Sequence, residues 1–150
     1  MKQIHIAAKI SCFFLMSFFF QSFAGPSGGD YYKVLLNNKL VTEQFLTKPV
    51  SMKTLSLTTA NSNDHLTVYY SHCGTAGKER SVSVRNHSGT ILKEWKFTDS
   101  KTMELQLPVK DILNASAKNG SVFLYYASKE IPSGKQLLAI DLSNKTVAKL

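Results

Sequence analysis

Apolar and polar residues alternate through most of the chain between residues 30 and 142. The alternation is clearest in five segments, at 54–58, 66–71, 81–85, 102–107 and 137–142. A period of two places one side of a β-strand against a core and leaves the other side in solvent. In the last segment, for example, Leu138, Ile140 and Leu142 are expected to face the core, and Leu137 is expected to face solvent. The pattern predicts antiparallel sheets, each with one solvated face.

Turn residues divide these strands into hairpins. Asn37 and Asn38 separate the apolar segments 32–36 and 39–46. Asn tolerates the positive φ that a two-residue type I′ turn requires, so this spacing predicts a tight hairpin. A second turn is expected at 87–89, which ends in Gly89 and joins 80–86 to 90–97.

Two segments depart from simple alternation. Val122–Ala127 is apolar on both faces, which predicts a central strand covered on both sides. At about 108–116 we expect a short helix, because Pro108 suits the first helical position and positions 109, 112 and 113 give one apolar face. A loop is the alternative for this second segment.

Strands of this number and length need a second layer to cover their apolar faces. We therefore predict an all-β fold, a two-sheet antiparallel sandwich of about seven to nine strands with immunoglobulin-like topology. Trp95, with Phe97 and Ile91, is expected to anchor its core, although the Cys…Trp…Cys spacing of antibody domains is absent. A small closed β-barrel is the alternative.

The first 24 residues have a different composition. Lys2 and Lys9 lead into a run rich in Phe, Leu and Met, and Ser22 and Ala24 provide small side chains where a signal peptidase cleaves. The run is shorter than the ~20 residues of a membrane-spanning helix. We expect a cleaved signal peptide, 1–24, a flexible segment, 25–29, and a single domain, 30–150. The protein is then periplasmic, attached to the cell surface or secreted, without a transmembrane segment.

Charge and cysteine content narrow the possible functions. The formal net charge of +8 falls to +6 when Lys2 and Lys9 leave with the leader. The remaining basic residues are mostly scattered Lys without an Arg cluster, which does not indicate a specific nucleic-acid partner. Cys73 would be the only cysteine of the processed chain, so no internal disulfide can form. We expect a buried, inert thiol, with an intermolecular disulfide or an activated nucleophile as alternatives.

Three stretches, GDYYKVLLNNKLV (29–41), LTVYYSHCG (66–74) and ILKEWKF (91–97), resemble those of short, exported, uncharacterised β-sandwich proteins of Bacteroidota-type bacteria. The resemblance covers most of the processed chain. It implies a bacterial envelope or secreted setting, and it brings no activity with it.

The polar stretch 71–80 contains the best candidate for local chemistry. Its glycines could expose backbone N–H groups as an anion nest beside Lys78 and Arg80, while His72 could activate Cys73. A turn between two strands is the simpler interpretation. His65, His72 and His87 lack the close spacing of a metal motif, so we predict no metal and no cofactor.

Tyr-Tyr doublets occur at 31–32, 69–70 and 125–126. Successive side chains of a strand point to opposite faces, so one ring of each doublet should point outward. We take Tyr31, Tyr69 and Tyr125 as the outward rings and expect them to form an aromatic platform if their strands are neighbours. The plainer explanation is that tyrosine favours half-buried strand positions.

The hydrolase motifs Gly-x-Ser-x-Gly, His-Glu-x-x-His and Cys-x-x-Cys do not occur in the sequence. The leading hypothesis is a non-catalytic binding or structural module that contacts an envelope protein or an extracellular polymer. One alternative is a glycan-binding module that uses the outward tyrosines. The other is a thiol or metal-binding protein centred on His72 and Cys73.

Overall fold

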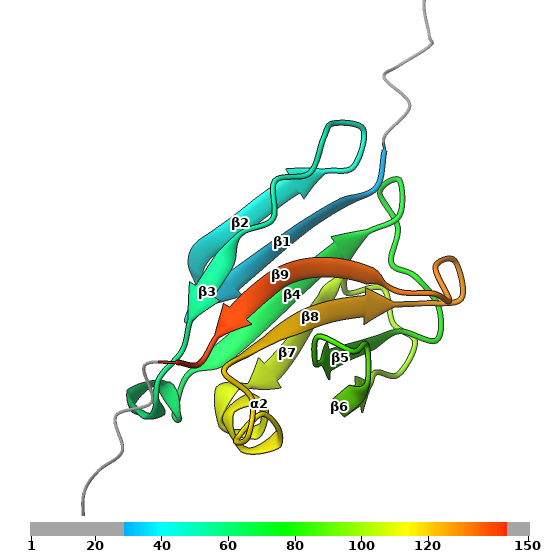
Figure 1. The fold of residues 1–150 in the computed structure, drawn as a ribbon. Helices are drawn as coiled ribbons and strands as arrows, with labels where there is room; N and C mark the ends of the chain where they lie inside the picture. Colours follow the sequence, from blue (N-terminus) through cyan, green and yellow to red (C-terminus); the bar gives the residue numbers. More distant parts are fainter. Residues whose placement is uncertain (1–28, 144–150) are drawn as a thin grey trace, which may run out of the picture.

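Two sheets packed face to face form the molecule in a computed structural model that describes residues 29–143 (Figure 1). The four-stranded sheet has the order β2-β1-β4-β7, made of Lys39–Phe45, Tyr31–Leu36, His65–Ser71 and Glu104–Pro108. The five-stranded sheet has the order β3-β9-β8-β5-β6, made of Thr54–Ser56, Lys135–Asp141, Ser121–Ala127, Ser81–Arg85 and Ile91–Lys96. The prediction of an all-β two-sheet sandwich is confirmed, and the alternative of a closed barrel is wrong.

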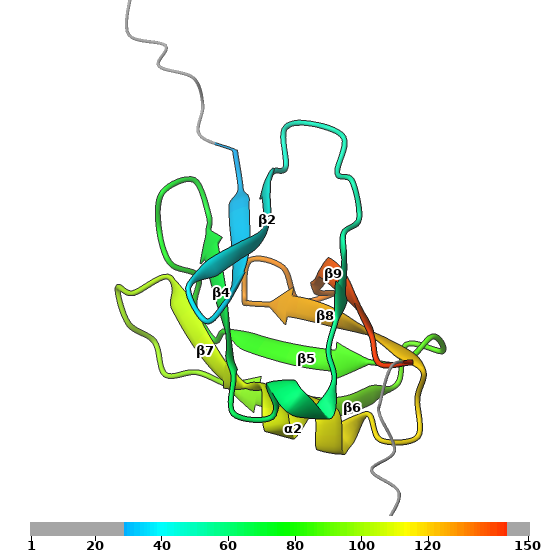
Figure 2. The ribbon, with the colours of Figure 1, turned by 90° about the vertical axis from the view of Figure 1, so that its left-hand side faces the viewer.

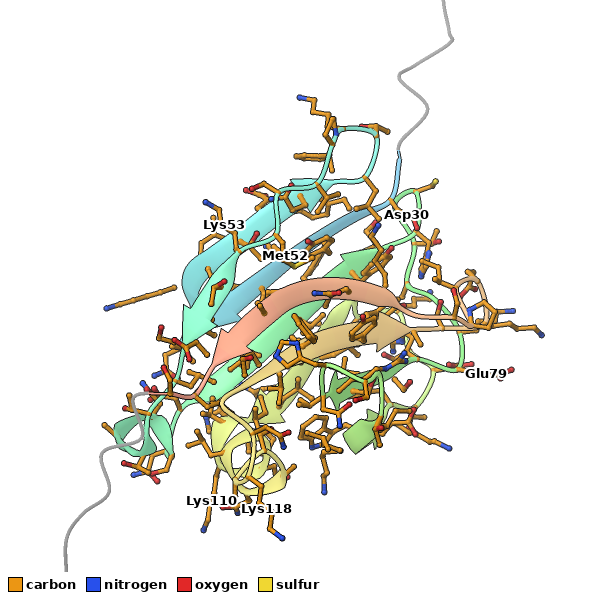
Figure 3. The ribbon with its side chains drawn as sticks, viewed as in Figure 1. Asp30, Met52, Lys53, Glu79, Lys110 and Lys118 are labelled. Carbon is orange, nitrogen blue, oxygen red and sulfur yellow. The ribbon has the colours of Figure 1, made fainter. Side chains whose placement is uncertain are left out.

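All strand pairs are antiparallel except β3 with β9, which run parallel. The chain passes from one sheet to the other through residues 46–53, where Met52 and Lys53 lie (Figure 3). The expected leader and most of the flexible segment fall outside the described residues. Within 29–143, no helix is long and apolar enough to cross a membrane.

The predicted helix is present as α2, Val109–Ala115. Pro108 precedes its first turn as the capping residue, one position earlier than expected. Val109, Ile112 and Leu113 are buried, as the apolar face predicted. The helix packs against β6, β7 and the 3₁₀ turn η2 (Thr59–Asn61) at one end of the sandwich (Figure 2).

The first hairpin forms as its turn residues predict. Asn37 and Asn38 have φ values of 47° and 64°, the left-handed conformation of a type I′ turn. The side chain of Asn37 donates to Asp64 at 2.6 Å, and its Oδ1 accepts the His65 N–H at 2.9 Å. These bonds attach the hairpin turn to the start of β4. They thereby support the pairing of β4 with β1.

Two core predictions are wrong because the strands contain register shifts. Leu137 is fully buried, since a bulge between β8 and β9 turns this extra residue into the core. Ile91 is exposed, since a shift between Val84 and Arg85 places it opposite Arg85. Leu92 packs against the core instead. Trp95 is partly buried there as predicted, with its Nε1 donating to Asp111 of α2 at 3.4 Å.

The strand predicted from Val122–Ala127 is β8, which lies between β9 and β5. The central position of β8 in its sheet is confirmed. Full burial of its side chains on both faces of the sheet is not. Phe123 and Tyr125 are only half-buried on the outer face, where the Arg85 guanidinium lies 4.3 Å from the Tyr125 ring centroid. On this outer face, Tyr125 is therefore covered in part by the Arg85 side chain of the neighbouring strand β5 and not by a further layer of structure.

The inner tyrosine of each doublet lies in the core. Tyr32, Tyr70 and Tyr126 are buried, and the Tyr70 ring stacks on Tyr126 with centroids 4.1 Å apart. Because Tyr70 belongs to one sheet and Tyr126 to the other, this stack joins the two layers. Tyr32 lies parallel to Tyr70 at 6.3 Å, and its hydroxyl donates to the Leu137 carbonyl at 2.9 Å. The buried rings therefore keep their polar atoms hydrogen-bonded.

We expect Tyr70→Ala to lower the free energy of unfolding by about 3–5 kcal/mol, because it removes a buried ring that spans both sheets. Tyr69→Ala, its outward neighbour, should cost about 1 kcal/mol or less. Urea unfolding followed by tryptophan fluorescence measures both values. Equal losses for the two variants would contradict the assignment of inner and outer rings.

Candidate functional site

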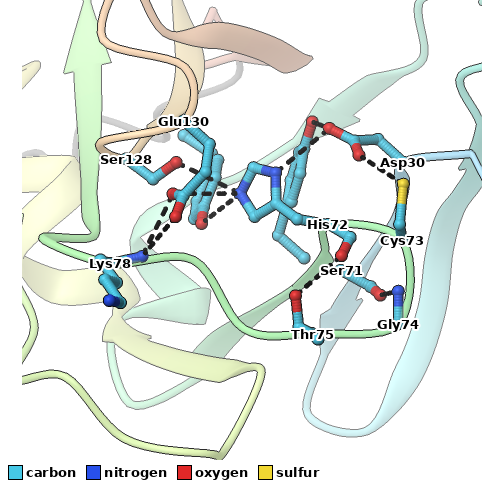
Figure 4. A network of polar contacts seen from close by, with 11 residues as sticks. Asp30, Ser71, His72, Cys73, Gly74, Thr75, Lys78, Ser128 and Glu130 are labelled. Carbon is cyan, nitrogen blue, oxygen red and sulfur yellow. Dashed lines mark hydrogen bonds and ion pairs between the residues drawn. The ribbon is translucent and has the colours of Figure 1, made fainter.

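A polar cluster around His72 lies where β4 ends, between the two sheets (Figure 4). The His72 side chain is 10% exposed. Its Nδ1 is 3.2 Å from Oδ2 of Asp30, which immediately precedes β1. The same carboxylate oxygen accepts the Tyr70 hydroxyl at 3.2 Å. Asp30 therefore joins the imidazole to the ring that stacks across the core.

The other imidazole nitrogen faces β8 and the turn that follows it. Nε2 lies 3.1 Å from the Tyr126 hydroxyl and 3.2 Å from the Ser128 hydroxyl. The carboxylate of Glu130 is 4.0 Å away and also accepts the Lys78 N–H at 3.1 Å. His72 thus connects the start of β1 with the β8–β9 turn, two segments from different sheets.

Burial and neighbouring charges shift the pKa values of this cluster. Burial raises the pKa of Tyr70, and the Asp30 carboxylate raises it further. Burial likewise raises the pKa of Tyr126. For Glu130, burial alone would raise the pKa, but hydrogen bonds from Ser128 and from backbone N–H groups, together with His72, lower it. The two phenols stay neutral at ordinary pH, while Glu130 is held in its ionised form.

The loop between β4 and β5 covers this cluster. A Cβ built on Gly77 would lie 2.6 Å from the Tyr126 hydroxyl and 2.8 Å from His72 Nε2, so only glycine fits there. Cys73 and Glu79, near the two ends of the loop, both have φ values of 50°. The backbone bends sharply at these points to bring Gly77 over the imidazole.

Asp30, His72 and Ser128 occur in the order of a hydrolase triad, with both contacts at 3.2 Å. Ser128 is only 4% exposed, and its hydroxyl also bonds Glu130. Gly77 lies over His72 Nε2, the nitrogen that would accept the Ser128 hydroxyl proton. This arrangement links the two sheets, and it leaves the Ser128 hydroxyl nearly buried.

Cys73 is exposed, so the expectation of a buried thiol is wrong. Its Sγ lies 3.8 Å from Oδ1 of Asp30, the carboxylate whose other oxygen contacts His72. The Asp30 carboxylate thus contacts the thiol with one oxygen and the imidazole with the other. The geometry does not form the Cys–His pair considered from sequence.

The anion nest considered from sequence is not assembled. Arg80 is 2% exposed, and its guanidinium donates to the Thr98 and Thr102 carbonyls and the Ser100 hydroxyl. It therefore holds the loop between β6 and β7. The backbone N–H of Lys78 donates a hydrogen bond to the Glu130 carboxylate. Neither residue presents its charge to the glycines.

The histidines do not converge on a metal site. His87 Nε2 lies 2.7 Å from the Ser121 hydroxyl, and its ring packs edge-on against Phe123. His65 is exposed at the start of β4. Among residues 29–143, no three His, Cys, Asp or Glu side chains come close enough to hold a metal ion.

A second candidate site lies on the outer face of the four-stranded sheet. Tyr31 and Tyr69 meet edge to face there with ring centroids 5.8 Å apart. Phe45 of β2 adds a third ring, 4.8 Å from Tyr31 and 54% exposed. These three residues form what we call the aromatic cluster. Tyr125 is not part of it, because it lies on the outer face of the opposite sheet.

Sequence reasoning missed Phe45, because a regular two-residue hairpin would place Gln44 opposite Tyr31, and only the register shift between Val34 and Leu35 brings Phe45 there. The Tyr31 hydroxyl donates to Glu43 at 2.6 Å. Burial, together with this bond and the Glu43 charge, raises the pKa of Tyr31 to about 12. The Lys33 ammonium lies 4.7 Å from the Tyr69 ring centroid, and the two residues are direct cross-strand partners. These contacts hold the Tyr31 and Tyr69 rings in place.

Comparisons with protein-family models, with curated proteins and with solved structures gave no match. The functional argument therefore rests on the two sites themselves.

Gly77→Ala should lower the free energy of unfolding by about 1–3 kcal/mol, because the new methyl group would collide with His72 and Tyr126. Gly120→Ala is the matched control, since nothing lies within 4 Å of its added Cβ. Thermal unfolding of both variants measures the difference. A Gly77→Ala protein as stable as the control would show that the loop does not close over the imidazole.

Glu130→Gln should remove a pH-dependent contribution to stability. The pKa of Glu130 lies below its ordinary value of 4.5, so the ionised form stabilises the fold above that pH. This contribution is lost as the pH falls through the lowered pKa. Because Glu130 is partly exposed, we expect a difference below about 1 kcal/mol at pH 7 that closes in acid. Urea titrations at several pH values test this, with Glu94→Gln as control; a constant difference would contradict it.

Proposed function

We propose that this protein is a non-catalytic, exported binding module that holds an extracellular polymer against the outer face of its four-stranded sheet. The observation that carries the proposal is the aromatic cluster of Tyr31, Phe45 and Tyr69. Large apolar side chains that stand together on a surface are typical of interaction sites. Here the ring of Phe45 is more than half exposed.

The cluster offers aromatic surface to a ligand, with ring planes inclined by 35° between Tyr31 and Phe45 and by 69° between Tyr31 and Tyr69. Aromatic rings offer large contact areas with few rotamers to lose, and Tyr retains a polar tip for orientation. The three rings come from adjacent strands β2, β1 and β4 in one sheet. A rigid sheet holds their spacing, so little conformational entropy is lost on binding.

The leader predicted for residues 1–24 supports an extracellular or periplasmic setting. A polymer of the envelope or its surroundings is the partner that this setting offers in greatest amount. An envelope protein is the competing partner, and the experiment below separates the two.

The strand order is also consistent with immunoglobulin-like topology. In this assignment β9-β8-β5-β6 would correspond to strands G, F, C and C′ of a variable-type domain, and β4 and β7 to B and E. Such sandwiches present broad sheet faces as well as end loops for binding. The assignment supports the proposal and does not depend on the resemblance to exported bacterial proteins.

The proposal predicts that the purified protein co-sediments with at least one of three insoluble polymers: cellulose, chitin or peptidoglycan. The double variant Tyr31→Ala/Phe45→Ala should weaken this retention about tenfold or more, because it removes two of the three rings of the aromatic cluster and the apolar area that they would bury against the polymer. Circular dichroism should show that the variant remains folded.

Tyr125→Ala is the control, because it removes an outward tyrosine from the opposite sheet. Its retention should match that of the unchanged protein. Failure to bind any polymer, or equal losses in both variants, would overturn the proposal. Retention only on an envelope fraction, abolished when protease digests that fraction, would assign the face to a protein partner instead.

A further inference from the structure

A polar hollow of about 310 Å³ lies next to the aromatic cluster on the same sheet face. Side chains of β1, β4 and β7 and of the neighbouring turns line it. Those that matter here are Lys33, Asn38, Thr67, Glu104 and Gln106. All of them come from outward positions or from the turn between β1 and β2.

The strand register makes the hollow continuous with the rings. Tyr31 and Phe45 are paired in one cross-strand row. The next row contains Lys33, Tyr69 and Glu104, and the row after it contains Thr67 and Gln106. Successive outward residues of a strand lie about 7 Å apart. An elongated ligand can therefore contact the rings with one part and the polar side chains with another.

The polar side chains of the hollow are available to a ligand. In the described part of the chain, no internal hydrogen bond engages the side chains of Asn38, Thr67 or Gln106. Amide groups both donate and accept, a hydroxyl does the same, and the Glu104 carboxylate accepts. Groups of this kind match a ligand that is rich in hydroxyls, whereas a protein partner would favour an apolar centre.

The charges of the cross-strand row beside the rings disfavour an acidic ligand there. Glu43 and Glu104 lie in the same row as Lys33, one on each side of it along the sheet. The row therefore carries a formal charge of −1. Repulsion between like charges would select against polyuronates and other polyanions.

We infer that the ligand is a neutral polysaccharide: a pyranose ring lies against Tyr31 and Phe45, and hydroxyls of an adjacent residue bond the hollow at Asn38, Thr67, Glu104 and Gln106. A pyranose has a face of C–H groups that packs on an aromatic ring and a rim of hydroxyls that pair with amides and carboxylates. The inference rests on the proposed function and names the substrate class of the same face.

Isothermal titration calorimetry with soluble hexasaccharides tests the inference. The neutral probes are cellohexaose, chitohexaose, maltohexaose and xylohexaose, and oligogalacturonate is the acidic probe. At least one neutral probe should bind, and oligogalacturonate should bind about tenfold more weakly or not at all. Phe45→Ala and Gln106→Ala should each weaken the neutral probe about tenfold, whereas Tyr125→Ala should leave it unchanged.

The outcomes separate this inference from the proposed function. If an insoluble polymer is retained through Tyr31 and Phe45 but no neutral hexasaccharide binds, the inference is overturned and the proposed function stands. Tighter binding of oligogalacturonate, or an unchanged affinity in Gln106→Ala, also overturns the inference. If neither polymers nor hexasaccharides bind, both fail.

Discussion

The alternation of side chains along a pleated strand is the constraint on which the rest of this structure depends. At three Tyr-Tyr doublets it sends one ring into the core and the other to the surface. The inner rings of β1, β4 and β8 hold the two sheets together, and two of the outer rings build a contact surface. One local rule thus separates a core ring from a surface ring within adjacent residues.

The inner layer is more than an apolar core, because its polar atoms are tied into a network. The Tyr70 hydroxyl and His72 share Asp30, and His72 reaches Tyr126, Ser128 and the β8–β9 turn. Such a network is costly if any member is left unpaired, so it favours a single arrangement of the sheets. The Gly77 backbone packs closely against the imidazole and the Tyr126 hydroxyl.

Local patterns were sufficient to predict the strands, the Asn37-Asn38 turn, α2 and the direction of each doublet ring, because period, turn chemistry and helix periodicity act over a few residues. Leu137 and Ile91 were misassigned because bulges shift the register, and a bulge has no signature in these segments. The His72 cluster could not be predicted, since Asp30, Ser128 and Glu130 reach it only through the packing of two sheets. Phe45 was missed because a register shift between Val34 and Leu35 brings it opposite Tyr31 in place of Gln44.

Hydroxyl-radical footprinting of the folded protein, with tandem mass spectrometry to separate neighbouring tyrosines, tests the division of the doublets most directly. Tyr31, Tyr69 and Tyr125 should be oxidised readily, while Tyr32, Tyr70 and Tyr126 should be protected until the protein unfolds. Equal oxidation of the two members of each doublet would contradict the account, since the inner stack and the outer cluster would then not exist as separate surfaces.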